Sequence, residues 1–164
     1  MGAKSSLAET KDREILLTRV FNAPRELVWE AWTKPEHVAL WWGPRGFTTT
    51  IHEMDVRPGG VWQHTMHSPD GTDYPNKNVF IEVSKPERIV YSLAGGKKGD
   101  SGVHSEVTWT FEAQGEKTKV TLRMVFSSTE ALARVVKTYG AIEGGKQTLD
   151  RFGEYLAKGL TPGV

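Results

Sequence analysis

Residues 103–126 read VHSEVTWTFEAQGEKTKVTLRMVF, and this stretch decides the fold. Apolar and polar residues alternate on both sides of Gly115, which predicts two strands, Val103–Glu112 and Thr118–Phe126, joined by a turn. One face of the pair is apolar and comprises Val107, Trp109, Phe111, Val120, Leu122, Met124 and Phe126. The opposite face carries charged residues and threonines. An antiparallel sheet with one covered face and one face toward water produces this pattern.

The period of two continues toward the N-terminus as far as Phe47. It predicts four more strands, which are separated by turns or loops rich in proline and glycine: Phe47–Val56, Val61–His67, Val79–Val83 and Ile89–Leu93. Proline presets φ and glycine permits a positive φ, so these residues are typical of tight turns. A β-rich segment at Glu14–Phe21 completes a set of seven strands.

Two short helices are predicted between the first and second strands. Pro24 suits the first turn of a helix over Arg25–Lys34. Thr33 and Glu36 have the spacing of a capping box, which predicts a second helix that ends at Trp42. Four of the six tryptophans lie in these two helices: Trp29, Trp32, Trp41 and Trp42.

The segment Thr129–Lys158 is predicted as one long helix because apolar residues recur on a single stripe. The stripe consists of Leu132, Val135, Tyr139, Ile142, Leu149, Phe152 and Leu156. Gly140, Gly144 and Gly145 interrupt it. Interior glycines favour a bend or a close approach of backbone, and the alternative is that they leave room for a ligand under the helix.

The order of elements predicts an α+β domain with a curved seven-stranded antiparallel sheet around a long C-terminal helix. One helix cannot cover such a sheet tightly along its whole length, so a cavity is expected between them. A chain of 164 residues is long enough for one domain. We place it at residues 13–158, between an N-terminal tail at 1–12 that is expected to be disordered and a C-terminal tail at 159–164.

Composition excludes several classes of function. The net charge is +1 and the chain has no cysteine, so it has no electrostatic footprint for nucleic acid and no thiolate, disulfide or cysteine-bearing zinc site. Neither a signal peptide nor an apolar stretch long enough to span a membrane is present. We therefore expect a cytoplasmic protein that binds no nucleic acid, no membrane and no cofactor. The sequence carries no signal for an oligomeric state.

No motif predicts a catalytic residue or a metal site. The segment from Gly140 to Gln147 has the frame of a phosphate-binding loop but lacks its final Ser or Thr. His64 and His67 are three residues apart on a strand and must face opposite sides, whereas His52 and His64 are expected to share a face. Glu53 and Asp55 favour a role in the adjoining turn. Ser, His and acidic residues show no arrangement that singles out a triad.

Five short motifs occur in an order that resembles a known family. They are Arg19-Val20-Phe21-Asn22-Ala23-Pro24, Val28-Trp29, Trp41-Trp42-Gly43-Pro44, Asp55-Val56-Arg57-Pro58-Gly59-Gly60 and Thr148-Leu149-Asp150-Arg151-Phe152. Over residues 13–158 the chain resembles the stand-alone bacterial proteins related to the C-terminal domain of the activator of Hsp90 ATPase. These proteins belong to the START-related, birch-pollen-allergen-like (SRPBCC) superfamily. The resemblance implies a helix-grip fold around a deep cavity, in a superfamily whose members bind lipids, sterols, polyketides or plant hormones and include some cyclases and hydrolases.

The preferred hypothesis is a small-molecule-binding protein that holds a hydrophobic or aromatic metabolite in this cavity, without catalysis. The predicted lining is Trp62, His64, Met66, Val79, Ile81, Tyr91, Trp109, Phe111, Leu122, Met124, Tyr139, Ile142, Gly145, Leu149 and Phe152. A second hypothesis is a cyclase or hydrolase in the same cavity, with His52 or His64 as general acid or base. A third is a co-chaperone-like module whose partner is the Hsp90 chaperone.

Overall fold

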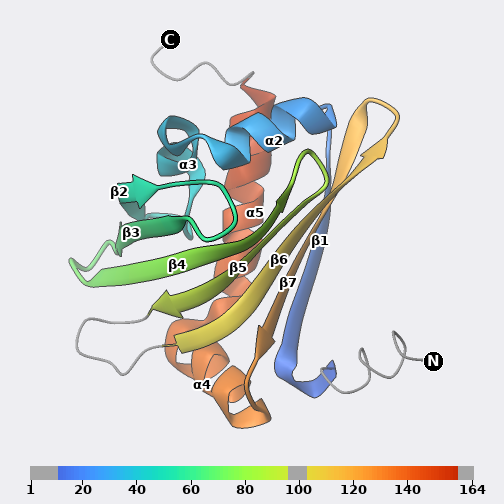
Figure 1. Cartoon of the computed structure of the whole chain (residues 1–164). Helices are drawn as coiled ribbons and strands as arrows, with labels where there is room; N and C mark the ends of the chain where they lie inside the picture. Colours follow the sequence, from blue (N-terminus) through green and yellow to red (C-terminus); the bar gives the residue numbers. More distant parts are fainter. Residues whose placement is uncertain (1–10, 96–102, 159–164) are drawn as a thin grey trace.

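The computed structural model describes residues 11–95 and 103–158 and contains a seven-stranded antiparallel sheet with helices on one face (Figure 1). The order across the sheet is β1-β7-β6-β5-β4-β3-β2, so the predicted α+β helix-grip fold is confirmed. The strands are β1 (Glu14–Phe21), β2 (Thr48–Met54), β3 (Val61–His67), β4 (Asp73–Ser84), β5 (Arg88–Gly95), β6 (Val103–Gln114) and β7 (Lys117–Phe126). The helices are η1 (Lys11–Arg13), α2 (Arg25–Thr33), α3 (Pro35–Trp41), α4 (Thr129–Tyr139) and α5 (Ala141–Ala157).

The helices divide the inner face of the sheet between them. Figure 1 shows α5 behind the sheet, with α2 and α3 at one end of it and α4 at the other. Residues 1–10 and 159–164 of the predicted tails lie outside the described residues. Regular structure begins with η1, two residues before the predicted start of the domain. Among the described residues, no helix has the length and apolar character needed to span a membrane.

Strand β4 differs most from its prediction. It begins at Asp73, six residues before the predicted Val79, because pairing with β3 and β5 keeps the weak β-formers of this segment extended. A register shift between Phe80 and Glu82 marks a bulge. A bulge adds one residue to one strand, and it therefore changes which residues face inward along that strand.

The predicted long helix is interrupted at Gly140. This residue adopts the left-handed conformation, with φ 59° and ψ 43°, and it ends α4 and precedes α5. Glycine reaches that conformation at little cost. The prediction of one continuous helix over Thr129–Lys158 is therefore wrong, whereas the predicted bend at the glycines is confirmed.

The other helical glycines allow α5 to lie close to β1. A Cβ atom on Gly145 would lie 2.7 Å from Cδ1 of Leu17, and one on Gly153 would lie 2.9 Å from Cε1 of Phe21. Real Cβ atoms do not approach other heavy atoms so closely. These glycines therefore serve helix–strand packing, which rules out the idea that Gly145 leaves room for a ligand.

Aromatic rings from both layers fill the space at the α2–α3 end. The side chains of Trp32, Trp41, Trp62 and Trp109 are fully buried. Trp32 of α2 is central, with five aromatic neighbours at centroid distances of 5.4–6.3 Å: Trp42, Trp62, Phe80, Tyr91 and Trp109. Trp41 of α3 stacks on Phe152 of α5 at 3.9 Å. Each such ring buries about 150–250 Å², so this cluster forms the main core.

Arg151 of α5 fastens the segment that leads from α3 into β2. Its Nη1 donates to the carbonyl oxygens of Trp42, Gly43, Pro44 and Phe47, and its Nη2 donates to that of Leu40, at 2.9–3.3 Å. Burial lowers the pKa of Arg151, and the charge of Arg45 adds to this effect. The guanidinium therefore positions the chain that carries Trp41 and Trp42 into the core.

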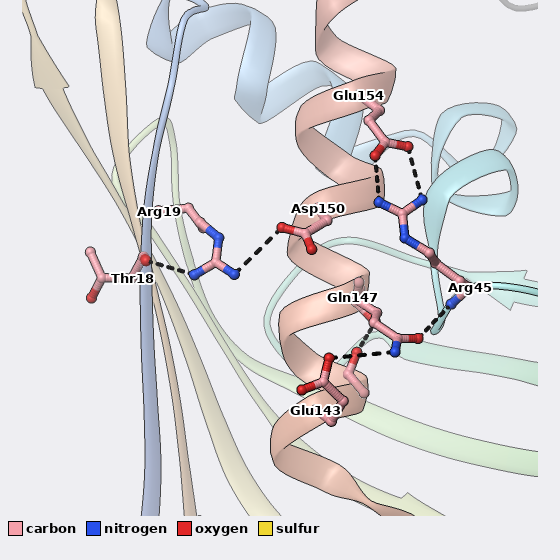
Figure 2. A network of polar contacts seen from close by, with 9 residues as sticks. Thr18, Arg19, Arg45, Glu143, Gln147, Asp150 and Glu154 are labelled. Carbon is pink, nitrogen blue, oxygen red and sulfur yellow. Dashed lines mark hydrogen bonds and ion pairs between the residues drawn. The ribbon is translucent and has the colours of Figure 1, made fainter.

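A second set of polar contacts lies on the exposed side of α5 (Figure 2). Glu154 pairs with Arg45, and Gln147 accepts a hydrogen bond from the backbone N–H of Arg45 at 3.1 Å. On the other side of the helix, Asp150 pairs with Arg19 of β1 at 3.4 Å. Exposed ion pairs add little stability, so these contacts set the position of α5 more than they strengthen the fold.

The predicted capping box at Thr33 is wrong. Thr33 is the last residue of α2, and its hydroxyl donates to the carbonyl of Trp29 at 2.8 Å. Lys34 precedes α3 without a side-chain cap. Pro35 occupies the first turn of α3, where a missing N–H carries no penalty.

We expect Arg151→Lys to lower the free energy of unfolding by about 1–3 kcal/mol, because an ammonium cannot reach carbonyls arranged around a planar guanidinium. Urea unfolding of both proteins measures the difference. The matched control is Arg45→Lys, which alters an exposed pair and should change stability little. Equal effects of the two substitutions would contradict the fastening role of Arg151.

Candidate functional site

Buried polar residues occupy part of the inner face of the sheet, on β3, β4 and β6. In one row across the strands, Trp62 pairs with Asn78, Asn78 with Leu93, and Leu93 with Ser105. In the next row, His64 pairs with Asn76. We call His64, Asn76, Asn78 and Ser105 the polar cluster. All four side chains are buried, with exposed fractions of 2%, 8%, 0% and 9%.

On one side of the polar cluster, the next two rows of the inner face are apolar. The row nearer to α2 and α3 contains Phe80, Tyr91 and Val107, and the row after that contains Ile89, Trp109 and Leu122. Each of these six side chains is 5% exposed or less. The inner face therefore changes from a packed aromatic core to a buried polar surface within one row.

Several polar atoms of this region lack a hydrogen-bond partner among the described residues. They are Nδ1 of His64, Nδ2 and Oδ1 of Asn78, Oγ of Ser105 and Nε1 of both Trp32 and Trp62. A buried polar group without a partner costs about 1–3 kcal/mol. Asn78 stands out because both polar atoms of a fully buried amide are unpaired.

Asn76 lies two residues away on the same face of β4 but differs from Asn78. Its Nδ2 donates to the backbone carbonyl of Tyr74 at 2.9 Å. Local satisfaction of this kind is the usual state of a buried amide. The contrast makes Asn78 the best candidate for contact with a ligand.

Aromatic rings keep His64 neutral and oriented. Its ring stacks on Trp62 at a centroid distance of 4.6 Å, and the edge contact with Trp42 is 5.9 Å. Burial lowers the pKa of His64 from 6.5 to about 3, and the charge of His52 adds a smaller effect in the same direction. At neutral pH this ring carries no charge and offers one nitrogen as acceptor and one as donor.

The apolar neighbours of the cluster are less completely covered than the core. Met66, Leu93 and Met124 alternate with outward-facing residues and pack against the core, yet all three are only partly buried. These three side chains therefore offer apolar surface that the core does not cover completely.

The structure places most of the predicted lining residues on the inner face, but several belong to the packed core. Inward-facing strand residues are Trp62, His64, Met66, Tyr91, Trp109, Phe111, Leu122 and Met124, and Leu149 and Phe152 are buried on α5. Tyr91 and Trp109 hydrogen-bond to each other, with Trp109 Nε1 donating to the Tyr91 hydroxyl at 3.3 Å. Burial raises the pKa of Tyr91.

Three predicted lining residues are misplaced and one falls outside the description. Val79 and Ile81 are 37% and 50% exposed on the outer face, because the bulge after Phe80 reverses the phase of β4. Ile142 is 39% exposed on α5. The side chain of Tyr139 lies outside the described residues.

The correct phase of β4 brings in residues that the sequence reasoning missed. With Phe80 inward, Asn78 and Asn76 follow at intervals of two, although both lie in a segment not predicted as strand. Ser105 was missed even though it continues the inward series of Trp109 and Val107. Extending the period of two by one residue from Val107 provides the signal for Ser105.

The other histidines of this region lie on the outer face. His52 Nε2 is 3.0 Å from Oγ1 of Thr65, on the outer face. The prediction that His52 and His64 share a face is therefore wrong. His67 bridges Thr50 and Asp73 at 2.8 Å each, on the side opposite His64. That opposition matches the prediction for His64 and His67. Within the ranges 11–95 and 103–158, no three His, Asp or Glu side chains gather in a group that suits a metal ion.

Asp55 belongs to the turn between β2 and β3. Its carboxylate pairs with Arg57 at 2.7 Å, and its carbonyl accepts from the N–H of Arg57. A Cβ on Gly60 would lie 1.9 Å from that carbonyl oxygen. The residues from Asp55 to Gly60 therefore form a compact turn, in line with the predicted turn role of Asp55.

A separate hollow of about 270 Å³ lies on the surface between α3 and α5. It is lined by Leu40, Arg45, Gly46, Arg151, Glu154, Tyr155 and Lys158. Four of its polar side chains are already engaged, since Arg45 pairs with Glu154, Arg151 binds carbonyls and Tyr155 contacts His37. We therefore favour the polar cluster, where polar atoms remain unpaired.

Comparisons with known proteins find a matching family and solved structures with the same fold. A family model described as activator of Hsp90 ATPase homolog 1-like protein matches residues 22–157. Protein Ms6760 from Mycobacterium smegmatis is 25% identical, with a TM-score of 0.81, and the match covers 91% of this chain and 94% of that one. A protein from Arthrobacter aurescens has a TM-score of 0.84 at 20% identity, over 93% and 91% of the two chains. The AHSA1 protein from Silicibacter pomeroyi has a TM-score of 0.74 at 20% identity, over 88% and 98%. No curated protein matches the chain.

The lowered pKa of His64 predicts a pH-dependent stability. The unfolded chain binds a proton near pH 6.5 and the folded chain only near pH 3, so stability falls as the pH is lowered through this window. The contribution is about 1.4 kcal/mol per pH unit. His64→Gln should remove this part of the slope in urea unfolding between pH 4 and 6, whereas His52→Gln should keep most of it. An unchanged slope in His64→Gln would contradict a buried neutral His64.

Because the amide of Asn78 is unpaired, replacing it with an apolar side chain should not lower the stability of the fold. Asn78→Leu should leave the free energy of unfolding unchanged or raise it by about 1–3 kcal/mol, because leucine has a similar size and no polar atom to satisfy. Asn76→Leu on the same face should lower it by about 1 kcal/mol, because it removes a made hydrogen bond. Urea unfolding decides the matter, and an equal loss in both variants would count against an unpaired Asn78.

Proposed function

The chain belongs to the family of activator of Hsp90 ATPase homolog 1-like proteins, and on this basis we propose that it is a small-molecule-binding protein. The ligand is a hydrophobic or aromatic metabolite held on the inner face of the sheet. Its polar end lies at the polar cluster, and its apolar body lies against the neighbouring side chains. The family's helix-grip fold is compatible with such a role.

One observation carries the proposal: polar atoms with no partner among the described residues lie in an otherwise apolar interior. Binding sites for small molecules are mostly apolar and contain a few polar groups that orient the ligand. The cost of leaving Asn78, His64 and Ser105 unpaired is offset when a ligand supplies the missing hydrogen bonds. Met66, Leu93 and Met124 provide partly accessible apolar surface beside these groups.

Tryptophan rings fill part of the inner face that the sequence predicted as the lining of a cavity. Trp32 and Trp41 from α2 and α3 occupy the inner face beyond Trp62. The ligand region is therefore limited to the rows of the inner face that contain the polar cluster.

Binding is favoured over catalysis by the state of His64. A general acid or base works best when its pKa lies near the operating pH. Burial lowers the pKa of His64 to about 3, so its neutral ring is a weak base and carries no proton to give as an acid near neutral pH. His52, the other candidate, lies on the outer face beside Thr65. A role as a chaperone partner and a cytoplasmic location stay predictions.

A thermal-shift screen with a mixed pool of apolar metabolites tests the proposal. A ligand that binds only the folded protein, at about a hundredfold excess over its Kd, should raise the Tm by roughly 5 °C or more. The ring of Trp62 lies beside the cluster, so the same compound should also change tryptophan fluorescence. Failure of every compound to raise the Tm would overturn the proposal.

Two histidines on one strand provide a matched pair of variants. His64→Gln should weaken binding of a compound found in the screen by about tenfold, the equivalent of one lost hydrogen bond. His67→Gln alters the opposite face of β3 and should leave the Kd unchanged. An equal loss in both variants would place the ligand away from the polar cluster.

A further inference from the structure

We propose that the ligand presents an uncharged carboxamide-like edge, a carbonyl beside an N–H, to the side chain of Asn78. This inference rests on the proposed function and names the chemical class that the same site selects. Carboxamides, lactams and imides have such an edge, as does an undissociated carboxylic acid. The argument depends on which hydrogen-bonding groups are unpaired and on how the strands place them.

The Asn78 side chain offers both a donor and an acceptor. Its Nδ2 and Oδ1 are unpaired among the described residues, and the side chain is fully buried. The two atoms lie side by side in one plane, so the group that satisfies both at once has an acceptor and a donor side by side as well. A ligand amide does so through two parallel hydrogen bonds. A ketone or an alcohol leaves at least one atom of Asn78 poorly paired.

Two further unpaired donors belong to tryptophans in the same part of the core. Trp62 pairs in register with Asn78, and its indole N–H is unpaired. The indole N–H of Trp32 is also unpaired, and the two rings are 5.4 Å apart. Indole donates and cannot accept. A carbonyl oxygen has two lone pairs, so it can accept from Asn78 and from one of these indoles together.

Charge selects against ionised ligands. A buried carboxylate or ammonium group needs a charged partner to offset its desolvation. No side chain of the polar cluster is acidic or basic except His64, whose lowered pKa keeps it neutral. An ionised carboxylate would also face Oδ1 of Asn78, and an ammonium group would face its Nδ2. Each ion therefore leaves one atom of the amide opposed by a like partial charge.

The surrounding side chains favour a flat apolar body next to the amide edge. The ring of His64 stacks on Trp62, with an interplanar angle of 25°. Leu93 lies between Asn78 and Ser105 in the same row and is partly buried. Aromatic and aliphatic surfaces at this position suit an aromatic or alicyclic carboxamide or lactam.

Five probes of nearly equal size and shape test the inference at pH 7. They are benzamide, benzoate, benzamidinium, acetophenone and α-methylstyrene, which present a donor–acceptor edge, an anion, a cation, an acceptor alone and no polar group. Affinities are measured by tryptophan fluorescence titration and by the shift in Tm. We expect benzamide to bind at least about tenfold more tightly than either ion. The affinity of acetophenone should lie between that of benzamide and those of the ions.

The variant Asn78→Leu tests whether the Asn78 amide causes the preference for benzamide. It should remove the advantage of benzamide over α-methylstyrene, while circular dichroism and the Tm report whether the variant is folded. Asn76→Leu, whose amide is already paired, should retain that advantage. If Asn78→Leu does not fold, the ranking of the five probes on the unaltered protein still decides the inference.

The outcomes separate this inference from the function on which it rests. If none of the five probes binds and the metabolite screen also finds no ligand, the proposed function is overturned. If benzoate, benzamidinium or α-methylstyrene binds as tightly as benzamide, only the carboxamide class is overturned. If benzamide is preferred but Asn78→Leu keeps the preference, Asn78 is not the group that recognises the amide edge.

Discussion

The close approach of α5 to β1 is the constraint on which the rest of the structure depends. Gly145 and Gly153 let the helix backbone lie against Leu17 and Phe21 at one edge of the sheet. A helix seated at that edge leaves the inner face of the middle strands for other elements to cover. Trp32 and Trp41, delivered by α2 and α3, fill that space at one end, and Arg151 holds the segment that follows them. Beyond the row of Phe80 and Tyr91 the inner face carries the polar cluster.

This arrangement separates stability from the proposed function. The packed aromatic end removes large apolar surfaces from water, and this is the dominant favourable contribution to folding. The polar cluster works against stability, because buried groups such as Asn78 lose hydrogen bonds to water without regaining them from the described residues. Natural proteins keep such unfavourable groups mainly at sites where function needs them. The cluster lies one row from the core, so a rigid scaffold positions it.

Much of the fold follows from local pattern. The alternation in β6 and β7 is clean, and the inner and outer faces of both strands agree with it. The site was harder to predict, because β4 contains apolar residues on both faces and a bulge between Phe80 and Glu82. A period of two counted through that bulge assigns Val79 and Ile81 to the wrong face. The same error hides Asn76 and Asn78, which lie in a stretch of weak β-formers.

The sequence by itself determined the family, the α+β class, the number of strands and a bend at the glycines of the C-terminal helical pattern, but not the division of that pattern into α4 and α5. These features depend on residue type and spacing along one segment at a time. Only the tertiary structure decided which face Asn78 occupies, that its amide is unpaired while that of Asn76 is not, and that tryptophans from α2 and α3 pack into the inner face. The physical reason is that a side chain's burial and its hydrogen-bond partners come from strands and helices far away in the chain. Local periodicity carries no information about those distant atoms.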